Sequence, residues 1–194
     1  MSTGSWREAA SVTSPTAFVN GRSSVIIREI VEHCGYNRTP GCALVDGRLQ
    51  VRCLFNDSLL TSLRGAVWNF PAFRKGRFTV SLRFNDLATK GHLLLNDRWF
   101  NPTDSVARYY APFDVPLSHK MLNISDNKPY LIRIDWNLDT KHPAAEVYVD
   151  NRKRLTVPLR NESQHGLSYV HFLSDTRIDD QGYEIEWVKA EVGR

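Results

Sequence analysis

The sequence predicts an all-β protein in which two antiparallel sheets pack face to face as a sandwich of the jelly-roll type. Apolar and polar residues alternate with a period of two through much of the chain, as they do in strands that bury one face. Turn residues such as Asp-Gly and Asn-Pro separate these stretches. The same alternation argues against a parallel α/β sheet, and with it against the usual nucleotide-binding and α/β-hydrolase folds.

The chain has 194 residues, of which 42% are hydrophobic and 24% charged, so it supports one domain with a sizeable core. We predict a flexible lead-in over residues 1–17, rich in Ser, Thr and Ala, and a single sandwich domain over residues 18–194. No apolar run is long enough to span a membrane, and no signal peptide is visible at the start. The expected location is extracellular for a processed or excised module, and cytoplasmic otherwise.

The first expected strands come from alternation and tight turns. Ser24–His33 has apolar spacing that fits a helix or a strand, and we interpret it as a strand. Asp46-Gly47 is a two-residue hairpin signal, and Arg48–Phe55 after it is apolar at every second position. Arg77–Phe84 places four apolar side chains on one face and Arg, Thr and Ser on the other. This last pattern is typical of a half-buried antiparallel strand.

The later strands follow the same logic. Tyr130–Trp136 alternates like Arg77–Phe84, and Asp150-Asn151 predicts a second tight hairpin. In Tyr183–Val192 the apolar phase switches after Trp187, which indicates a β-bulge or a buried edge. The remaining strand candidates are Ala66–Phe70, His92–Asn96, Glu146–Val149, Arg154–Leu159 and Ser168–Leu173.

Four motifs follow one another in the second half of the chain. They are the strand FTVSLRF at 78–84, a strand ending in Asp-Trp at 135–136, a Tyr-Val-Asp hairpin at 148–150, and a closing Gly-x-x-Ile-Glu-x-Val at 182–188. This order resembles the laminin-G-like, or concanavalin A-like, lectin and glucanase sandwich, and the sandwich modules found beside sialidase-like propeller enzymes. The resemblance covers about residues 66–192. It implies a glycan-related role, although lectins, adhesion modules, hydrolases and lyases all share this fold.

The most unusual stretch is 96–113, NDRWFNPTDSVARYYAPF, whose aromatic and polar side chains alternation does not explain. Its Asn-Pro pair and mixed polarity predict a long structured loop. Aromatic rings bind the apolar faces of sugars, while Asp, Asn and Arg bond hydroxyls or a carboxylate. The alternative is a loop folded over the end of the sandwich, its aromatics filling the core. The predicted binding residues are Asp97, Arg98, Trp99, Asn101, Tyr109 and Tyr110.

Catalytic residues stay unassigned by the sequence, so whether the protein is an enzyme is left open. The Glu-x-Asp-x-x-Glu run that glucanases of this sandwich commonly carry is missing. Glu184 and Glu186 lie two apart on one strand face, and we interpret them as solvent-facing carboxylates rather than an acid and nucleophile pair. His171 lies mid-strand, facing a cleft or solvent, and is the one histidine that merits a test for acid–base chemistry.

No cofactor or metal centre is predicted. Three acidic residues in one loop could hold a structural calcium ion, because carboxylates and carbonyls supply the oxygen ligands that calcium prefers. An acidic turn is the alternative interpretation. These residues are Asp175, Asp179 and Asp180. A disulfide between Cys34 and Cys42 is compatible with the sequence, which leaves that pairing open.

We therefore predict a carbohydrate-binding β-sandwich, either lectin-like or an accessory module with a neighbouring catalytic domain. A formal net charge of +4 suits an acidic glycan. The basic clusters lie beside turns rather than in one stripe, so a nucleic-acid partner is not expected. One alternative is a small glycoside hydrolase or polysaccharide lyase with its site on the concave sheet. The other is a structural or protein-interaction sandwich with no sugar site.

Overall fold

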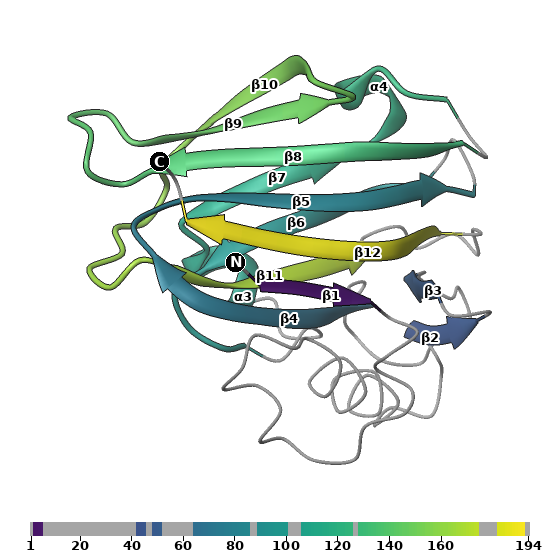
Figure 1. The fold of residues 1–194 in the computed structure, drawn as a ribbon, viewed down its shortest axis with the longest axis horizontal. Coiled ribbons are helices and arrows are strands. Elements are labelled where there is room, and N and C mark those ends of the chain that lie inside the picture. Colours follow the sequence, from purple (N-terminus) through teal and green to yellow (C-terminus); the bar gives the residue numbers. More distant parts are fainter. Residues whose placement is uncertain are drawn as a thin grey trace.

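The computed structural model describes residues 2–5, 42–45, 48–51, 64–85, 89–100, 106–125, 128–174 and 182–192. These residues form two antiparallel sheets packed face to face, which confirms the predicted all-β sandwich (Figure 1). Within the described ranges, only two short helices occur, α3 (Val106–Tyr110) and α4 (His119–Leu122). No helix among these residues is long and apolar enough to cross a membrane.

The larger sheet has the strand order β10-β9-β8-β5-β12-β3-β2, and β1 pairs with β12 beside this path. Its central strands β8, β5 and β12 run the length of the sandwich in Figure 1. Its strands are β1 (Ser2–Ser5), β2 (Cys42–Val45), β3 (Arg48–Val51), β5 (Lys75–Phe84), β8 (Pro129–Asn137), β9 (Ala144–Val149), β10 (Arg152–Pro158) and β12 (Tyr183–Val192).

The smaller sheet has the order β4-β11-β6-β7, so β11 and β6 are its inner strands. Each predicted strand in this part of the chain is present, with small differences in its ends. The additional strand β7 starts inside the stretch that the sequence predicts to be a loop. The strands are β4 (Arg64–Phe73), β6 (Gly91–Asn96), β7 (Phe113–Leu117) and β11 (Leu167–Ser174).

The core lies between the two sheets and is rich in aromatic rings. Phe78 of β5 contacts Trp68 of β4 at a ring-centroid distance of 5.8 Å and Phe172 of β11 at 6.1 Å. All three side chains are fully buried. Alternate residues of β8 are buried, as the period-two pattern predicts. Contacts of this kind join the two sheets across the sandwich.

Both predicted hairpins are confirmed. Asp150 and Asn151 have φ angles of 47° and 65°, the two positive values that a type I′ turn between β9 and β10 requires. Val45 of β2 lies opposite Arg48 of β3, which leaves only Asp46-Gly47 to connect them. The turn residues 46–47 themselves lie outside the described residues.

The predicted irregularity in β12 is a β-bulge. The register against β5 shifts between Ile185 and Trp187. Ile185 is fully buried, whereas Trp187 is 37% exposed. The bulge therefore turns the indole away from the core, although spacing alone would place both side chains on the same face.

Several predicted features lie outside the described residues. Within the predicted lead-in, only Ser2–Ser5 is described, as β1 with Ser5 opposite Trp187. The domain boundary at residue 17 stays a prediction. Also outside are Ser24–His33, the predicted strand beyond Val51, the side chains of Cys34 and Cys42, and Asp175, Asp179 and Asp180.

Candidate functional site

Five of the six predicted binding residues are described: Asp97, Arg98 and Trp99 follow β6, while Tyr109 and Tyr110 end α3, which packs against the smaller sheet. His171 of β11 forms hydrogen bonds with two residues of this region. Its Nε2–H donates to the carbonyl of Phe100 at 3.1 Å, and its Nδ1 accepts from the Asn96 amide at 2.9 Å. Burial lowers the pKa of His171 to about 4, so the ring is neutral at pH 7 and has the one donor and one acceptor that these bonds need.

His171 is therefore a structural residue. It is fully buried, so the prediction that it faces a cleft or solvent is wrong. Its hydrogen bond to the Phe100 carbonyl holds the backbone next to Trp99 in place. Acid–base chemistry at this imidazole is excluded for a ligand in solvent, because no exposed atom of the ring can reach it.

The aromatic residues of the segment divide into a buried and an exposed group. Phe100 packs on a small apolar cluster of the smaller sheet and α3, and Phe113 is fully buried in β7. Trp99, Tyr109 and Tyr110 are 52%, 69% and 49% exposed. Both alternatives drawn from the sequence are thus partly realised: some rings fill the core and others face solvent.

The exposed tyrosines are ordered by ring contacts. Tyr110 stacks on Phe100 with centroids 6.2 Å apart and ring planes at 5°. Tyr109 meets Tyr110 edge to face at 4.9 Å. Trp99 precedes Phe100 in the chain, so its backbone is tied to the same stack. These contacts place the two exposed tyrosines beside Phe100, which packs on the buried cluster.

The prediction of one long loop over 96–113 is wrong for its second half. Val106–Tyr110 forms helix α3, and Phe113 begins strand β7. The helix buries Ala107 against the sheet, while Phe113 starts an alternation of buried and partly exposed residues. Residues 101–105 lie outside the described residues, so the predicted role of Asn101 has no structural description.

The chain after β10 fixes the end of α3. The Asn161 amide donates to the carbonyls of Tyr109 and Ala111, at 3.0 Å each. The backbone N–H of Arg160 donates to the carbonyl of Pro112 at 2.9 Å. Carbonyls at the end of a helix have no partner within the helix, so these bonds hold the exposed tyrosines against the rest of the protein.

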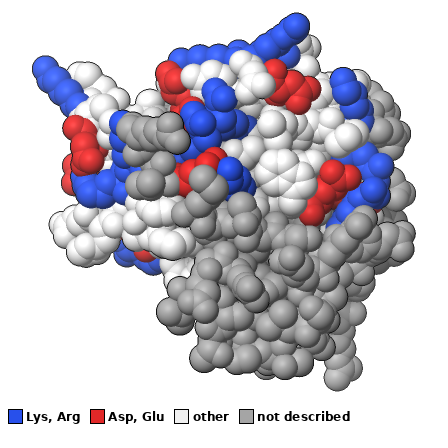
Figure 2. All heavy atoms as spheres, in the orientation of Figure 1, with Lys and Arg blue, Asp and Glu red and all other residues white. Residues whose placement is uncertain are grey.

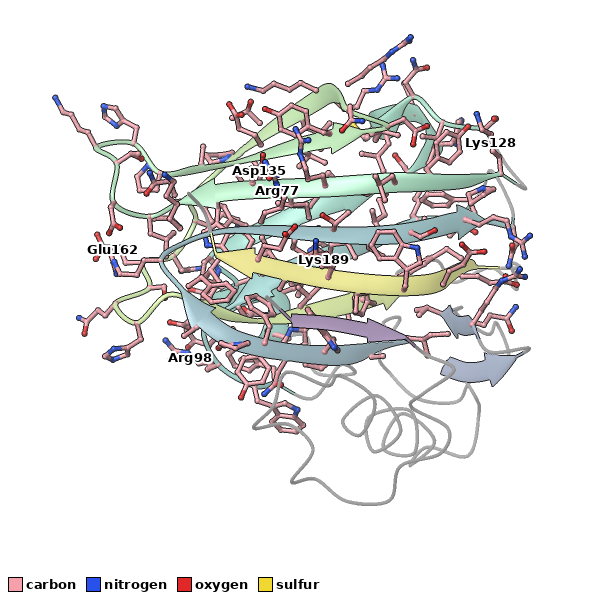
Figure 3. The ribbon with its side chains drawn as sticks, in the orientation of Figure 1. Arg77, Arg98, Lys128, Asp135, Glu162 and Lys189 are labelled. Carbon is pink, nitrogen blue, oxygen red and sulfur yellow. The ribbon has the colours of Figure 1, made fainter. Side chains whose placement is uncertain are left out.

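Asp97 and Arg98 form an ion pair beside the aromatic residues. The Arg98 Nε and Nη2 atoms donate to the two carboxylate oxygens of Asp97 at 2.8 and 3.2 Å. Burial would raise the pKa of Asp97, but hydrogen bonds and charge from Arg98, with a hydrogen bond from Ser163, outweigh it and lower that pKa. Arg98 points to solvent, and Asp97 is largely covered. Figure 3 labels Arg98 and Glu162 toward the same end of the sandwich.

A second charged cluster, which the sequence does not predict, lies next to α3. The Asp114 carboxylate accepts from Arg108 Nε at 2.8 Å, from Arg160 Nη1 at 2.8 Å, and lies 2.6 Å from His92 Nδ1. Burial opposes ionisation here, but His92 and Arg108 lower the pKa of Asp114 to about 2. Only folding brings Arg160 to this site, so spacing in the sequence gave no signal.

A second candidate site is a groove of about 580 Å³ at the outer face of the larger sheet. Arg77 of its lining donates to both carboxylate oxygens of Asp135, at 2.7 and 3.0 Å. Glu146 accepts from Lys153 Nζ and from the Tyr148 hydroxyl, both at 2.6 Å. The hydrogen bond from Lys153 lowers the pKa of Glu146, which disfavours this residue as the proton-donating acid of a hydrolase. Figure 2 shows positive and negative side chains mixed over this face.

Glu184 and Glu186 of β12 form a separate charged cluster, in which Arg48 pairs with both carboxylates. Arg83 and Asn85 bind Glu184 at 2.6 and 3.1 Å, and the Ser81 hydroxyl donates to Glu186 at 3.0 Å. The expectation of two solvent-facing carboxylates is corrected for Glu184, whose side chain is only 14% exposed. These partners tie the carboxylates into the sheet surface. Among the described residues, no group of three or more potential metal ligands is arranged around a common point.

No protein-family model and no curated protein sequence matches the chain. Among solved structures, similarity is found to a sialidase with 14% identity and a TM-score of 0.55, over 78% of this chain and 16% of that one. A Trypanosoma rangeli sialidase has 13% identity and a TM-score of 0.50, over 79% of this chain and 26% of that one. The Caenorhabditis elegans galectin LEC-6 has 11% identity and a TM-score of 0.42, over 63% and 89%.

The two sialidase similarities establish a shared fold and not a shared activity, because their identities are so low. They support the concanavalin-like sandwich that the sequence motifs indicate. This chain spans 16% and 26% of the lengths of those two chains. The finer resemblance, to laminin-G-like and sialidase-accessory modules, stays a prediction.

Proposed function

We propose that this protein is a carbohydrate-binding sandwich, either lectin-like or an accessory module of a glycan-active enzyme. One observation carries the proposal: Trp99, Tyr109 and Tyr110 expose about half or more of their area, and ring contacts link the two tyrosines to Phe100. Removing a large aromatic side chain from water lowers the free energy, so an ordered exposed group of such side chains marks a ligand site. Sugar rings offer the flat apolar C–H faces that such a surface binds.

The neighbouring polar groups complete the proposed site. Arg98 is held by Asp97 and projects to solvent, where it can donate to sugar hydroxyls or to a carboxylate. Asp97 acts through Arg98, because its own oxygens are largely covered. Asn101 remains the proposed amide donor from the sequence analysis. The fold similarity to parts of two longer sialidase chains supports an accessory module next to a catalytic domain.

Affinity electrophoresis and calorimetry against a panel of neutral and acidic polysaccharides test this proposal. We expect Trp99→Ala and Tyr109→Ala each to weaken binding about tenfold, since an exposed aromatic stack contributes on the order of 1–2 kcal/mol. The matched control is Trp187→Ala, which removes an exposed indole from the outer face of the larger sheet. Loss of binding in Trp187→Ala, but not in Trp99→Ala, would move the site to that sheet.

The groove on the larger sheet keeps a catalytic alternative open. Asp135, Glu146 and Glu191 contribute carboxylates to its lining, and a glycoside hydrolase needs two such groups. This second candidate requires release of reducing ends or unsaturated uronates from the polysaccharide panel, and loss of that activity in Glu146→Gln. An inactive protein that also binds no polysaccharide would instead favour the structural or protein-interaction alternative.

A further inference from the structure

Two arginines, one in α3 and one from a distant part of the chain, share a single buried carboxylate. Arg108 lies in α3, directly before Tyr109, and Arg160 follows β10. Both donate to the same oxygen of Asp114, whose side chain is only 7% exposed. Two full positive charges therefore face one negative charge, and the surplus is positive even when His92 is neutral.

Much of the hydrogen-bonding capacity of these guanidinium groups is unused. Arg108 binds Asp114 through Nε alone and Arg160 through Nη1 alone, while each guanidinium carries five N–H donors. Neither arginine has another carboxylate partner within the part of the chain that the structure describes. The two side chains are 44% and 43% exposed, so their remaining donors can reach a ligand from solvent.

We infer that Arg108 and Arg160 form an anion subsite that binds the carboxylate of an acidic sugar whose ring lies on Tyr109. This inference rests on the carbohydrate-binding function proposed above and names its ligand class. The planar guanidinium fork matches a carboxylate in two parallel hydrogen bonds, which a hydroxyl cannot form. A sulfate ester presents similar oxygens, and the experiment below separates the two.

Backbone connections bring the two arginines close to the end of the helix that carries Tyr109. Arg108 is bonded in the chain to Tyr109, and Arg160 is bonded to Asn161, whose amide donates to the Tyr109 carbonyl at 3.0 Å. Asp114 is a positioning residue: it is buried, it is bonded to three donors, and it keeps both guanidinium groups in one orientation. A ligand anion then meets donors that are already ordered, which reduces the entropy cost of binding.

Calorimetry with three probes tests the subsite: oligogalacturonate for carboxylates, dextran sulfate for sulfate esters, and dextran for neutral sugar. We expect Arg108→Gln and Arg160→Gln each to weaken binding of oligogalacturonate about tenfold or more, as loss of a charge-assisted pair implies, and to leave dextran binding unchanged. Arg160→Lys keeps the charge but loses the fork, and we expect it to restore less than half of the lost binding free energy.

The matched control is Arg152→Gln, which removes the same charge from the hairpin at the far end of β10. In that hairpin, the backbone N–H of Asp150 donates to the carbonyl of Leu131 at 2.9 Å, close to the start of β8. Figure 3 shows Lys128, just before β8, at the opposite end of the sandwich from Arg98. We expect Arg152→Gln to bind like the wild type. Each single Arg variant leaves Asp114 one arginine and His92, and thermal unfolding checks that the fold is intact.

The outcomes are distinguishable. If the protein binds sugars but Arg108→Gln and Arg160→Gln behave like Arg152→Gln, the anion subsite is wrong and the carbohydrate function stands. If the wild type prefers dextran sulfate to oligogalacturonate, the carboxylate assignment is overturned. If no probe and no other polysaccharide binds, the proposed function fails and the subsite fails with it.

Discussion

The burial of His171 shows a limit of predicting a side chain's environment from its position in a strand. Mid-strand position suggested a side chain facing a cleft or solvent. The structure buries it, because β11 is an inner strand whose two faces are covered by the sandwich core and by Phe100 and α3. A pattern of alternation describes one strand only, so it cannot show which other segment folds over the strand's outer face.

Burial of His171 gives a pH dependence of stability. Its pKa falls from 6.5 to about 4 in the folded protein, so the folded state favours the neutral ring. The contribution of the neutral ring to the free energy of unfolding is fully present above pH 6.5 and is lost as the pH falls toward 4. At 1.36 kcal/mol per pKa unit, this loss reaches roughly 3 kcal/mol. We expect urea unfolding at a series of pH values to show this decline in the wild type.

The control for this prediction is His171→Gln, whose side chain does not titrate. Its unfolding free energy should lack the decline between pH 6.5 and 4. The Asp114 carboxylate titrates in a separate window, because its pKa falls from 3.8 to about 2 and its contribution is lost below pH 3.8. An unaltered slope above pH 4 in the variant would show that His171 is not the responsible group.

At the scale of elements, turns and bulges are the features best specified by local sequence. The β9–β10 turn has positive φ at Asp150 and Asn151, which few residues other than Asn, Asp and Gly adopt readily. The bulge between Ile185 and Trp187 follows from a change of apolar phase. The helix α3 was missed, because five residues are too few to show a helical period.

The β9–β10 turn supports a matched pair of substitutions. Asn151→Gly creates Asp-Gly, the favoured type I′ pair, and we expect the free energy of unfolding to rise by up to roughly 0.5 kcal/mol. The substitution also removes the exposed hydrogen bond from Arg133 to the Asn151 side chain, which reduces this gain. Asn151→Val forces a β-branched residue to a φ of 65°, and we expect a loss of roughly 1–2 kcal/mol. Chemical denaturation measures both, and a stable Asn151→Val would argue against a type I′ turn.

At the scale of the whole molecule, the sequence predicts the sandwich well and its surface chemistry poorly. Each strand must bury one face, so a local pattern in β5 or β8 already reports the global fold. The cluster of Arg108, Asp114 and Arg160 depends on contacts between segments up to 46 residues apart. Such contacts are set by the path of the chain, which no local pattern encodes. The exposure of Trp99 and Tyr109 likewise depends on how the folded chain packs around them.

The aromatic contacts across the core predict that both sheets unfold as one unit. Phe172 of the smaller sheet is fully buried against Phe78 of the larger sheet. Phe172→Ala leaves a cavity between the sheets, and we expect it to cost roughly 3–5 kcal/mol. In a two-state unit, hydrogen exchange should show slow amides of β5 and β11 losing the same free energy of protection. If only β11 and its neighbours lost protection, the sheets would unfold separately, and the sandwich would not provide one rigid base for the proposed site.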